Sequence, residues 1–359
     1  MSGTSAARSV RVRWAVVLGL LLSWSILLLG FVLRFARVNR YFSYWWPSWG
    51  SGLALIWAFL SVLLVAALFI SRWALRARSE HSPSRRAFLN TSRAALVCAP
   101  ALVTGYGVFI QRFHLSLREQ NLEFPDLPED LNGLRLVQLT DIHLSPFLSE
   151  RELARAVDMA NETRAHVALV TGDLITTLHD PLDACLRQLS RLQAEAGVFG
   201  CLGNHEIYAN AEDYVEKQGA RLGHRYLRSR RETLKFGRAA LNLAGVDYQR
   251  TSKPYLVGAE RLIVPEAFNV LLSHNPDVFP VAARQGYPLT IAGHTHGGQV
   301  RVEILGEDLN IARFFTPYVD GLYRRGGAAV FVSRGIGTIG LPARLGAPPE
   351  VNLLRLCRT

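Results

Sequence analysis

The chain has 359 residues, 49% of them hydrophobic, and a formal net charge of +11. Residues 1–112 carry 13 arginines and one acid, whereas residues 113–359 carry 27 basic and 28 acidic side chains. A nucleic-acid-binding domain needs a basic surface, so the near-neutral C-terminal part disfavours a nucleic-acid partner. The four cysteines form no C-x-x-C pair, and they indicate neither a disulfide framework nor a redox compartment.

Two apolar runs without charge, 14–33 and 53–70, come first in the chain. Each is long enough to cross a hydrocarbon core of roughly 30 Å. Aromatic side chains cluster between them at 41–49, as they do where a helix meets the membrane interface. A third run, 94–110, is shorter and is interrupted by proline and glycine. We therefore expect residues 1–112 to form a membrane region with two to three transmembrane helices.

The arginines predict the topology of this region. Six of them lie between residues 72 and 93, and the positive-inside rule places that loop in the cytoplasm. The segment S-R-R-A-F-L-N at 84–90 resembles the twin-arginine export signature, and the alternative is a charged flank that only orients the third run. If run 94–110 crosses the membrane, the C-terminal domain lies outside the cytoplasm. If it lies on the interface, the domain stays inside. We expect a multi-pass protein of the cell (inner) membrane with an extracytoplasmic domain.

Residues 113–133 are predicted to be a linker, because they contain prolines among acids and end in an Asn-Gly turn. After them, apolar strands alternate with amphipathic helices, which indicates an α/β domain over residues 134–359. The predicted strands are 134–140, 166–171, 198–202, 269–273 and 289–292, the predicted helices are 150–161 and 182–194, and further strands are expected at 233–236, 240–244, 328–333 and 351–356. The β-rich stretches favour two packed sheets flanked by helices over one parallel sheet.

Five short motifs follow the predicted strands. They are D-I-H at 141–143, G-D at 172–173, G-N-H-E at 203–206, His274 in L-S-H-N-P, and G-H-T-H-G-G-Q at 293–299. Strand ends of an α/β sheet hold side chains on rigid backbone beneath mobile loops. Carboxylate, amide and imidazole groups suit divalent manganese, iron or zinc. A pair of such cations is a common catalyst of phosphate ester cleavage.

Each motif alone has an ordinary structural explanation. Asp141 or Asp173 alone would more often cap a helix or make a turn, and a lone His274 would more often be a hydrogen-bonded core histidine. The pair His294 and His296 is a stronger signal, because side chains at i and i+2 of extended backbone face the same way. The ordered set of five motifs favours a two-metal centre.

Residues 134–359 resemble the calcineurin-like metallophosphoesterase superfamily. The best match is its membrane-associated bacterial branch, which carries G-H-T-H-G-G-Q, here at 293–299, and P-P-E, here at 348–350. The resemblance implies a four-layer αββα sandwich with the metals at one edge. It also implies a set of two-metal ligands: Asp141, His143 and His296 for the first metal, Asp173 as the bridge, and Asn204, His274 and His294 for the second. By the same resemblance, His205 contacts the scissile phosphate. Glu206, the next residue of the motif, is expected to hold the ligand residues in place without binding a metal itself.

The expected function is that of a membrane-anchored two-metal phosphohydrolase. It would cleave a phosphodiester or pyrophosphate bond through a metal-bridging hydroxide, with phosphodiesters favoured over monoesters and a lipid-linked phosphoester as a candidate substrate. The membrane is the other expected partner. The alternative is a non-catalytic membrane scaffold or metal-binding module on a decayed esterase fold, which lost ligands would reveal. All seven ligand positions and His205 are present.

Overall fold

The computed structural model describes residues 45–75, 83–249, 255–304 and 307–359, together with scattered positions between 14 and 29. The chain divides into two compact units. The first comprises Met1–Phe109 with Gly340–Pro342, and the second comprises Ile110–Ile339 with Ala343–Thr359. Each unit is described by itself.

The first unit contains helix α2 (Trp45–Leu75) and helix α3 (Pro83–Phe109), which pack against each other. Among the described residues, two helical stretches are long and apolar enough to cross a membrane, Ser48–Ile70 and Asn90–Phe113. Their apolar side chains point outward, as at Phe69, which is 72% exposed. A helix with apolar side chains exposed on its surface is typical of a segment that lies in the hydrocarbon core of a membrane. The expected span 14–33 and the start of the aromatic segment 41–49 fall largely outside the described residues.

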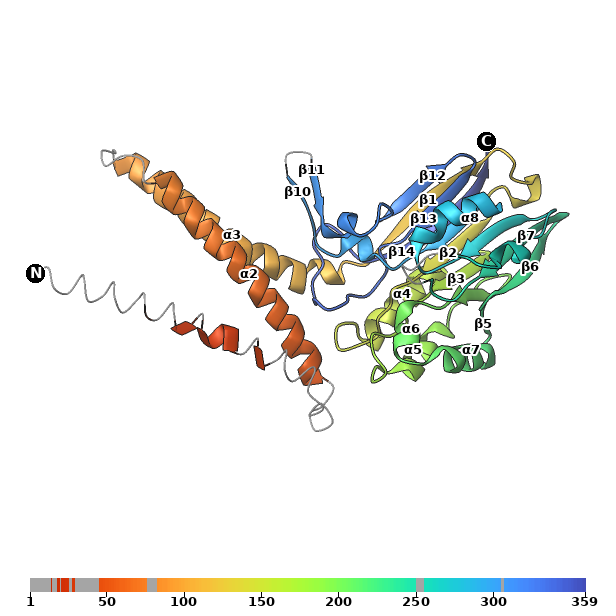
Figure 1. Ribbon diagram of the computed structural model, residues 1–359, viewed down its shortest axis with the longest axis horizontal. Helices are drawn as coiled ribbons and strands as arrows, with labels where there is room; N and C mark the ends of the chain where they lie inside the picture. Colours follow the sequence, from red (N-terminus) through yellow and green to blue (C-terminus); the bar gives the residue numbers. More distant parts are fainter. Residues whose placement is uncertain are drawn as a thin grey trace, which may run out of the picture. The chain divides into compact units, whose positions relative to one another are not determined.

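The second unit contains two six-stranded sheets and a hairpin within the described part of the chain (Figure 1). The first sheet has the order β1-β14-β2-β3-β4-β5: Ser116–Phe124, Glu350–Arg358, Arg135–Leu139, Val167–Thr171, Val198–Cys201 and His224–Tyr226. The second has the order β12-β13-β9-β8-β7-β6: Gly321–Arg325, Ala328–Val332, Leu289–Ala292, Phe268–Leu272, Ala239–Gly245 and Arg230–Phe236. Strands β10 (Arg301–Ile304) and β11 (Glu307–Asn310) form the hairpin. Parallel pairing of β2, β3 and β4, and of β7, β8 and β9, brings their carboxyl ends to one edge of each sheet.

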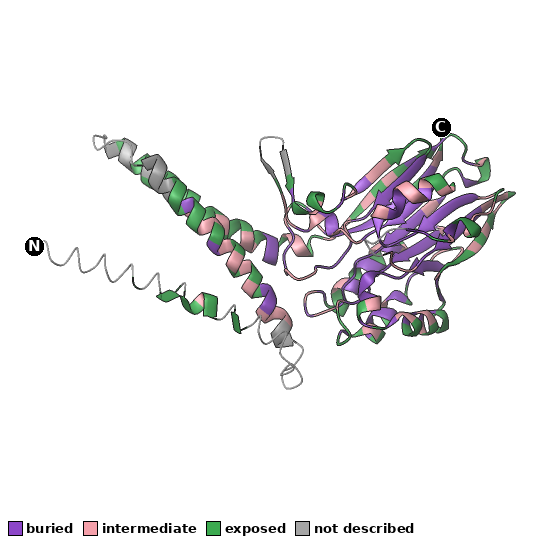
Figure 2. Cartoon of the chain, in the orientation of Figure 1, coloured by how far each residue is buried: buried purple, intermediate pink, exposed green. Residues whose placement is uncertain are grey.

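The sheets pack face to face and are covered by helices on their outer sides. Successive residues of β2 show the layering: Leu136 lies in the core between the sheets, and Val137 lies in the core under the helices. Figure 2 shows both sheets as buried strands with exposed residues mainly on the helices and hairpins. The first sheet is covered by α4 (Glu150–Glu162), α5 (Leu182–Leu189) and α7 (Glu212–Arg221), and the second by α8 (Phe279–Gln285). The expected four-layer αββα sandwich is confirmed.

Local sequence signals explain several elements. Helix α4 begins with a capping box, in which Ser149 Oγ accepts from the Glu152 backbone N–H and Glu152 Oε2 accepts from the Ser149 N–H at 2.7 Å. The five strands expected ahead of the motifs are confirmed as β2, β3, β4, β8 and β9. The short elements α6 (Asn204–Tyr208), α7, α8, β5, β10 and β11 were not predicted, because a few residues give too little periodicity to recognise.

Residues 113–133 are more ordered than the linker that their prolines predicted. Strand β1 pairs in parallel with β14 over nine residues, from Ser116 opposite Glu350 to Phe124 opposite Arg358. Within β1, Leu122 and Phe124 are buried in the core between the sheets. Burial alternates along β1 as in an edge strand with one buried face, but the apolar pattern is confined to Leu122 and Phe124, so the sequence carried too weak a signal for a strand.

Core packing predicts a contrast between two phenylalanines. Phe331 on β13 is fully buried between the sheets, whereas Phe314 is 88% exposed. Replacing Phe331 with Ala leaves a cavity and should lower the free energy of unfolding by about 3–5 kcal/mol. Phe314→Ala should change it by less than about 0.5 kcal/mol. Thermal unfolding of the full chain in detergent, followed by circular dichroism, measures both, and equal melting temperatures would contradict the assigned core.

Candidate metal centre

The five sequence motifs meet at one edge of the sandwich. Asp141 comes two residues after β2, Asp173 two after β3 and His274 two after β8. Asn204 begins the short helix α6 after β4, and the G-H-T-H-G-G-Q loop follows β9. Because parallel strands end side by side, residues up to 155 positions apart in sequence become neighbours there, as His296 and Asp141 do.

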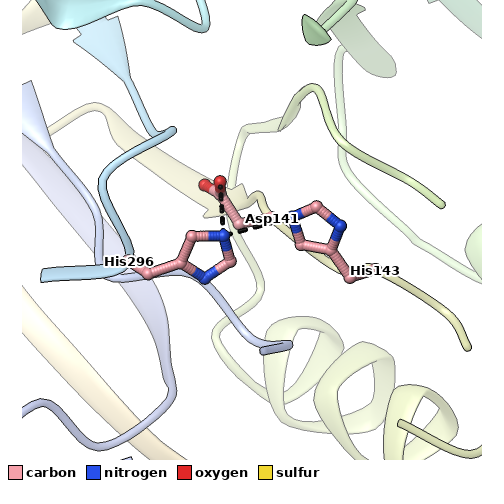
Figure 3. Close-up of side chains that lie close together, drawn as sticks. All are labelled: Asp141, His143 and His296. Carbon is pink, nitrogen blue, oxygen red and sulfur yellow. Dashed lines mark hydrogen bonds and ion pairs between the residues drawn. The ribbon is translucent and has the colours of Figure 1, made fainter. Parts of the chain in front are cut away.

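The first group of side chains comprises Asp141, His143 and His296, which point toward one another (Figure 3). His296 Nε2 lies 3.1 Å from His143 Nε2 and 3.4 Å from Asp141 Oδ1. All three residues are buried. Two ring nitrogens and a carboxylate oxygen therefore converge on one small volume away from bulk water.

The second group comprises Asp173, His274 and His294. His274 Nδ1 donates to the carbonyl oxygen of Thr171 at 2.7 Å, so the proton of the neutral ring belongs on Nδ1. The other nitrogen, Nε2, then presents its lone pair to Asp173 Oδ2 at 3.0 Å. Two electron-rich atoms at that distance repel each other unless a proton or a metal cation lies between them.

Asn204 and His205 lie at the start of α6, beside the second group. The side-chain oxygen Oδ1 of Asn204 is buried and has no hydrogen-bond partner among the described residues. A buried polar atom without a partner is costly and calls for a water or an ion that binds it. The His205 backbone N–H donates to Asp173 Oδ1 at 2.9 Å, and its ring Nδ1 lies 2.7 Å from the Thr176 carbonyl oxygen. The contact with the carbonyl leaves the His205 Nε2 atom without a proton in the neutral ring.

Backbone strain is concentrated in these loops. Five of the candidate ligand residues have left-handed backbone angles: Asp141, His143, Asp173, His294 and His296, with φ between 47° and 77°. The conformation costs about 1–3 kcal/mol for each non-glycine residue and persists where surrounding structure or function demands it. Strain at five candidate ligands supports a site shaped for binding rather than for stability.

Glycine lets the loops approach one another closely. A Cβ atom added to Gly203 would clash with the Asp173 carboxylate, and one added to Gly293 would clash with the carboxylate of Asp141. Both glycines belong to the motifs, and neither needs a left-handed backbone angle. Their role at this edge is to admit a neighbouring carboxylate where any side chain would exclude it.

Burial keeps most of the imidazoles of the site neutral. It lowers the pKa of His143 to about 3 and, together with His274, that of His294 to about 4. Burial also acts to lower the pKa of His274, but the nearby carboxylates of Asp173 and Asp141 outweigh it and raise that pKa to about 10. The carboxylates therefore favour a positive charge near His274 Nε2. Divalent cations would supply that charge, and neutral imidazoles are the form that binds them.

The donor set fits two divalent cations. It offers carboxylate oxygen, amide oxygen and imidazole nitrogen, it is buried, and two of its atoms, Asn204 Oδ1 and His274 Nε2, lack hydrogen-bond partners among the described residues. Asp173 Oδ2 lies 3.5 Å from His143 Nε2 and 3.0 Å from His274 Nε2, so this carboxylate touches both groups. The clustered Asp and His residues fit a dinuclear site.

Three contributors to the site had not been singled out in the sequence. Thr176 contacts two histidines: its Oγ1 lies 3.1 Å from His143 Nδ1 and its carbonyl oxygen accepts from His205. Arg344 is fully buried, and its Nη2 lies 3.3 Å from His296 Nδ1. Tyr248 Oη lies 3.5 Å from His294 Nε2. Only Thr176, three residues after Asp173, had a position that pointed to the site.

Residues 221–238 carry seven basic side chains, and none of them belongs to the groups of candidate ligands. Arg228 donates to the carboxylates of Asp213 and Asp247, and Arg225 pairs with Glu232 at 2.6 Å. The positive charges of Arg225 and Arg228 are thus paired with acidic side chains on α7, on β6 and just after β7. These ion pairs indicate a solvated, charge-paired hairpin rather than a phosphate-binding patch.

Glu206 ties two of the motif loops together. Its carboxylate accepts backbone N–H groups of Gly203, Asp173 and Leu174 at 2.7, 3.0 and 2.7 Å. It is fully buried and faces the backbone rather than the cluster of ligand atoms. The backbone positions of Asp173 and Asn204 therefore depend on one carboxylate.

The substitution Glu206→Gln tests this dependence. The amide NH₂ must face at least one of three buried N–H donors, so we expect a loss of about 1–3 kcal/mol in unfolding free energy. Displaced ligands should also weaken metal retention by about 10–100-fold. Thermal unfolding and metal content after dialysis against a chelator measure the two effects. Glu232→Gln, on the surface, is the matched control, and equal metal retention in both variants would contradict the role of Glu206.

Comparison with known proteins agrees with this geometry. Residues 134–298 match the family model of the calcineurin-like phosphoesterases. The chain is 26% identical over 283 residues to the metallophosphoesterase YkuE of Bacillus subtilis, an alignment that covers 77% of this chain and 98% of YkuE. It is 28% identical over 331 residues to the transmembrane protein with metallophosphoesterase domain of Danio rerio, covering 85% of this chain and 73% of that protein.

A further relative is the phosphodiesterase YaeI of Escherichia coli, which is 27% identical over 288 residues and aligns over 76% of this chain and 99% of its own length. The family match begins at the residue before β2 and ends within the G-H-T-H-G-G-Q loop, so it includes all five motifs. The segment that carries all five motifs thus matches the calcineurin-like phosphoesterase family.

Proposed function

We propose that this protein is a membrane-anchored phosphohydrolase that uses two divalent cations to cleave a phosphodiester or a pyrophosphate bond. The observation that carries the proposal is the convergence of buried lone-pair donors from five separate loops. Such a cluster is stable only with positive charge at its centre. Manganese, iron and zinc all suit the donor set. A lipid-linked phosphoester is the first substrate class to test.

The proposed ligands divide between two cations as the contacts suggest. Asp141, His143 and His296 would hold one cation. His274, His294 and Asn204 would hold the other, and Asp173 would bridge, which its proximity to both groups supports. When bound, such a pair of cations lowers the pKa of water and offsets charge on the phosphate oxygens.

His205 is proposed to act on the leaving group. Its backbone is tied to Asp173 and its ring to the Thr176 carbonyl, so its orientation is fixed from two directions. With Nδ1 engaged by the carbonyl, Nε2 is the atom that would carry a proton to the departing alkoxide. The partial exposure of His294 beside it supports approach of substrate from this side.

Membrane attachment is proposed from the first unit. The apolar stretches Ser48–Ile70 and Asn90–Phe113 have the length of membrane spans, and the relative from Danio rerio is named as a transmembrane protein. We propose a membrane region over 1–112 and a phosphoesterase domain over 134–359, whose first sheet is completed by β1 from the segment between them. A catalytic domain held at the bilayer meets lipid-linked substrates at a high effective concentration. A decayed, non-catalytic scaffold is not favoured, because every proposed ligand is present.

Activity and metal content should separate the roles of two residues. On bis-p-nitrophenyl phosphate with added manganese, His205→Ala should lower kcat by about 10²–10⁴-fold and keep its metal, because His205 is proposed to move a proton. Asp173→Asn should lose both activity and metal, because it removes the charge that touches both ligand groups. The assay uses the full chain in detergent, with metal measured by mass spectrometry.

His179→Ala is the control for these variants, because His179 is exposed in the loop after Asp173 and lies outside the clusters. Its activity should equal that of the wild type. A folded, metal-loaded wild type with no activity on diester, monoester or pyrophosphate substrates would refute the hydrolase proposal.

The proposed topology can be tested with a single cysteine. In a background with Cys98 and Cys357 replaced by Ser, Arg238→Cys should react with a membrane-impermeant maleimide on intact spheroplasts, because the domain is proposed to lie outside the cytoplasm. Ser79→Cys, in the predicted cytoplasmic loop, should react only after lysis. The reverse pattern would place the domain in the cytoplasm.

A further inference from the structure

An apolar surface stands out on the second unit. The hairpin β10–β11 and the short 3₁₀ helix η7 (Ile311–Phe314) that follows it expose Val302, Leu309, Ile311, Phe314 and Phe315, which we call the Phe314 ridge. Phe314 is 88% exposed and Phe315 is 82% exposed. On the hairpin, Val302 pairs with Leu309 across the strands, so these two side chains share one face. Exposed apolar side chains gathered in one short segment are typical of an interaction site.

The Phe314 ridge is attached directly to the metal-site loops. Asn310, at the end of β11, donates through Nδ2 to the carbonyl oxygen of Gly297 at 3.0 Å, next to His296. After the ridge, Thr316 Oγ1 donates to Asp277 Oδ1 at 2.5 Å, in the segment that follows His274. The position of the ridge relative to the loops that carry two candidate ligands is therefore fixed by these bonds.

The base of the same hairpin lies beside the point where the chain arrives from α3. The Arg301 N–H, at the start of β10, donates to the carbonyl oxygen of Leu345 at 2.8 Å. The N–H of the next residue, Gly346, donates to Gln111 Oε1 at 2.8 Å. Gln111 is two residues beyond the end of α3 in the chain, and its neighbour Ile110 is 57% exposed. The residues through which the chain enters the domain and the base of the hairpin are thus joined within the second unit.

Strand registers show that this place is on the same edge as the metal centre. Ser116, the first residue of β1, lies opposite Glu350, the first residue of β14. Strand β14 runs antiparallel to β2, with Asn352 opposite Gln138, close to the carboxyl end of β2 where Asp141 follows. The beginning of β1 and the candidate ligands therefore share one edge of the sheet.

We infer that the Phe314 ridge docks on the lipid bilayer, with Phe314 and Phe315 entering the interfacial layer. The inference rests on the proposed membrane attachment and goes beyond it, because it assigns a second, separate contact and an orientation. A bilayer is favoured over a protein partner because only a few residues of chain connect the apolar helix α3 to this edge, so an α3 that spans the membrane keeps the edge near the bilayer. Exposed phenylalanines are side chains that interfacial segments insert among lipids.

The orientation has a consequence for the substrate. If the Phe314 ridge lies on the bilayer, the metal centre faces the headgroup layer, and a phosphoester at headgroup depth reaches it without leaving the membrane. Substrates with a membrane-embedded tail then gain from docking, whereas a small soluble diester does not. Docking thus acts on substrate access and leaves the ligands unchanged.

Lipid-dependent quenching tests the contact in the full chain. Single cysteines at Phe314→Cys, Phe315→Cys and Arg238→Cys, in the Cys98→Ser and Cys357→Ser background, are labelled with an environment-sensitive fluorophore. Arg238 follows the turn Gly237 before β7, at the edge away from the metal centre, and is exposed. Each protein is reconstituted in phosphatidylcholine–phosphatidylglycerol vesicles with or without doxyl-labelled lipid. Positions 314 and 315 should lose about half of their emission or more, and position 238 should lose little.

A second variant removes the contribution of the label itself. A fluorophore at Ile311→Cys should be quenched in the otherwise unchanged ridge and should escape quenching when Phe314→Asp and Phe315→Asp are added. Hydrolysis of the soluble diester should stay unchanged in this variant, which shows that the domain is folded.

The outcomes separate docking from anchoring. Protein that fails to float with the vesicles would refute the membrane attachment and the docking together. Protein that floats while positions 314 and 315 remain as unquenched as position 238 would refute docking and leave the proposed function standing. Quenching between labels on separate copies, without quenching by lipid, would assign the ridge to a contact between copies and also overturn the inference.

Discussion

The structure depends on the burial of two carboxylates and a set of imidazole lone pairs in one small volume. Asp141 and Asp173 are almost entirely removed from water, and the ring nitrogens of His143, His274 and His296 point at them or at each other. Without positive charge at the centre this arrangement is repulsive. Only the surrounding fold, a rigid pair of sheets with a continuous core, holds the loops against that repulsion.

The sandwich supplies that rigidity in a specific way. Strands β2, β3 and β4 end side by side, and so do β8 and β9, so each loop needs to carry only one or two ligands. Glu206 joins two loops by accepting three backbone N–H groups. Arg344 contacts His296 in a third loop and donates to the carbonyl oxygen of Arg334. Left-handed backbone at the ligands is tolerated because these contacts leave the chain no alternative.

The same edge also collects the features that relate the domain to a membrane. The chain arrives there from α3, and the β10–β11 hairpin rises next to that point through the contacts of Gln111, Gly346 and Arg301. The edge where the substrate must arrive is thus the one that carries exposed Phe314 and Phe315. Because β1 begins at the edge where β2 ends, the chain enters the domain on the side that carries the candidate ligands.

The sequence alone was enough for the strands that precede the motifs, the order of the motifs and the layered fold, because a buried strand and a short motif are local signals. Its account of 113–133 as a linker missed β1, whose pairing with β14 joins residues more than 230 positions apart. The roles of Arg344 and the Phe314 ridge were likewise not predicted, since nothing in their local sequence differs from an ordinary loop. Their roles arise from which distant backbone atoms lie beside them, and only the tertiary structure decides that.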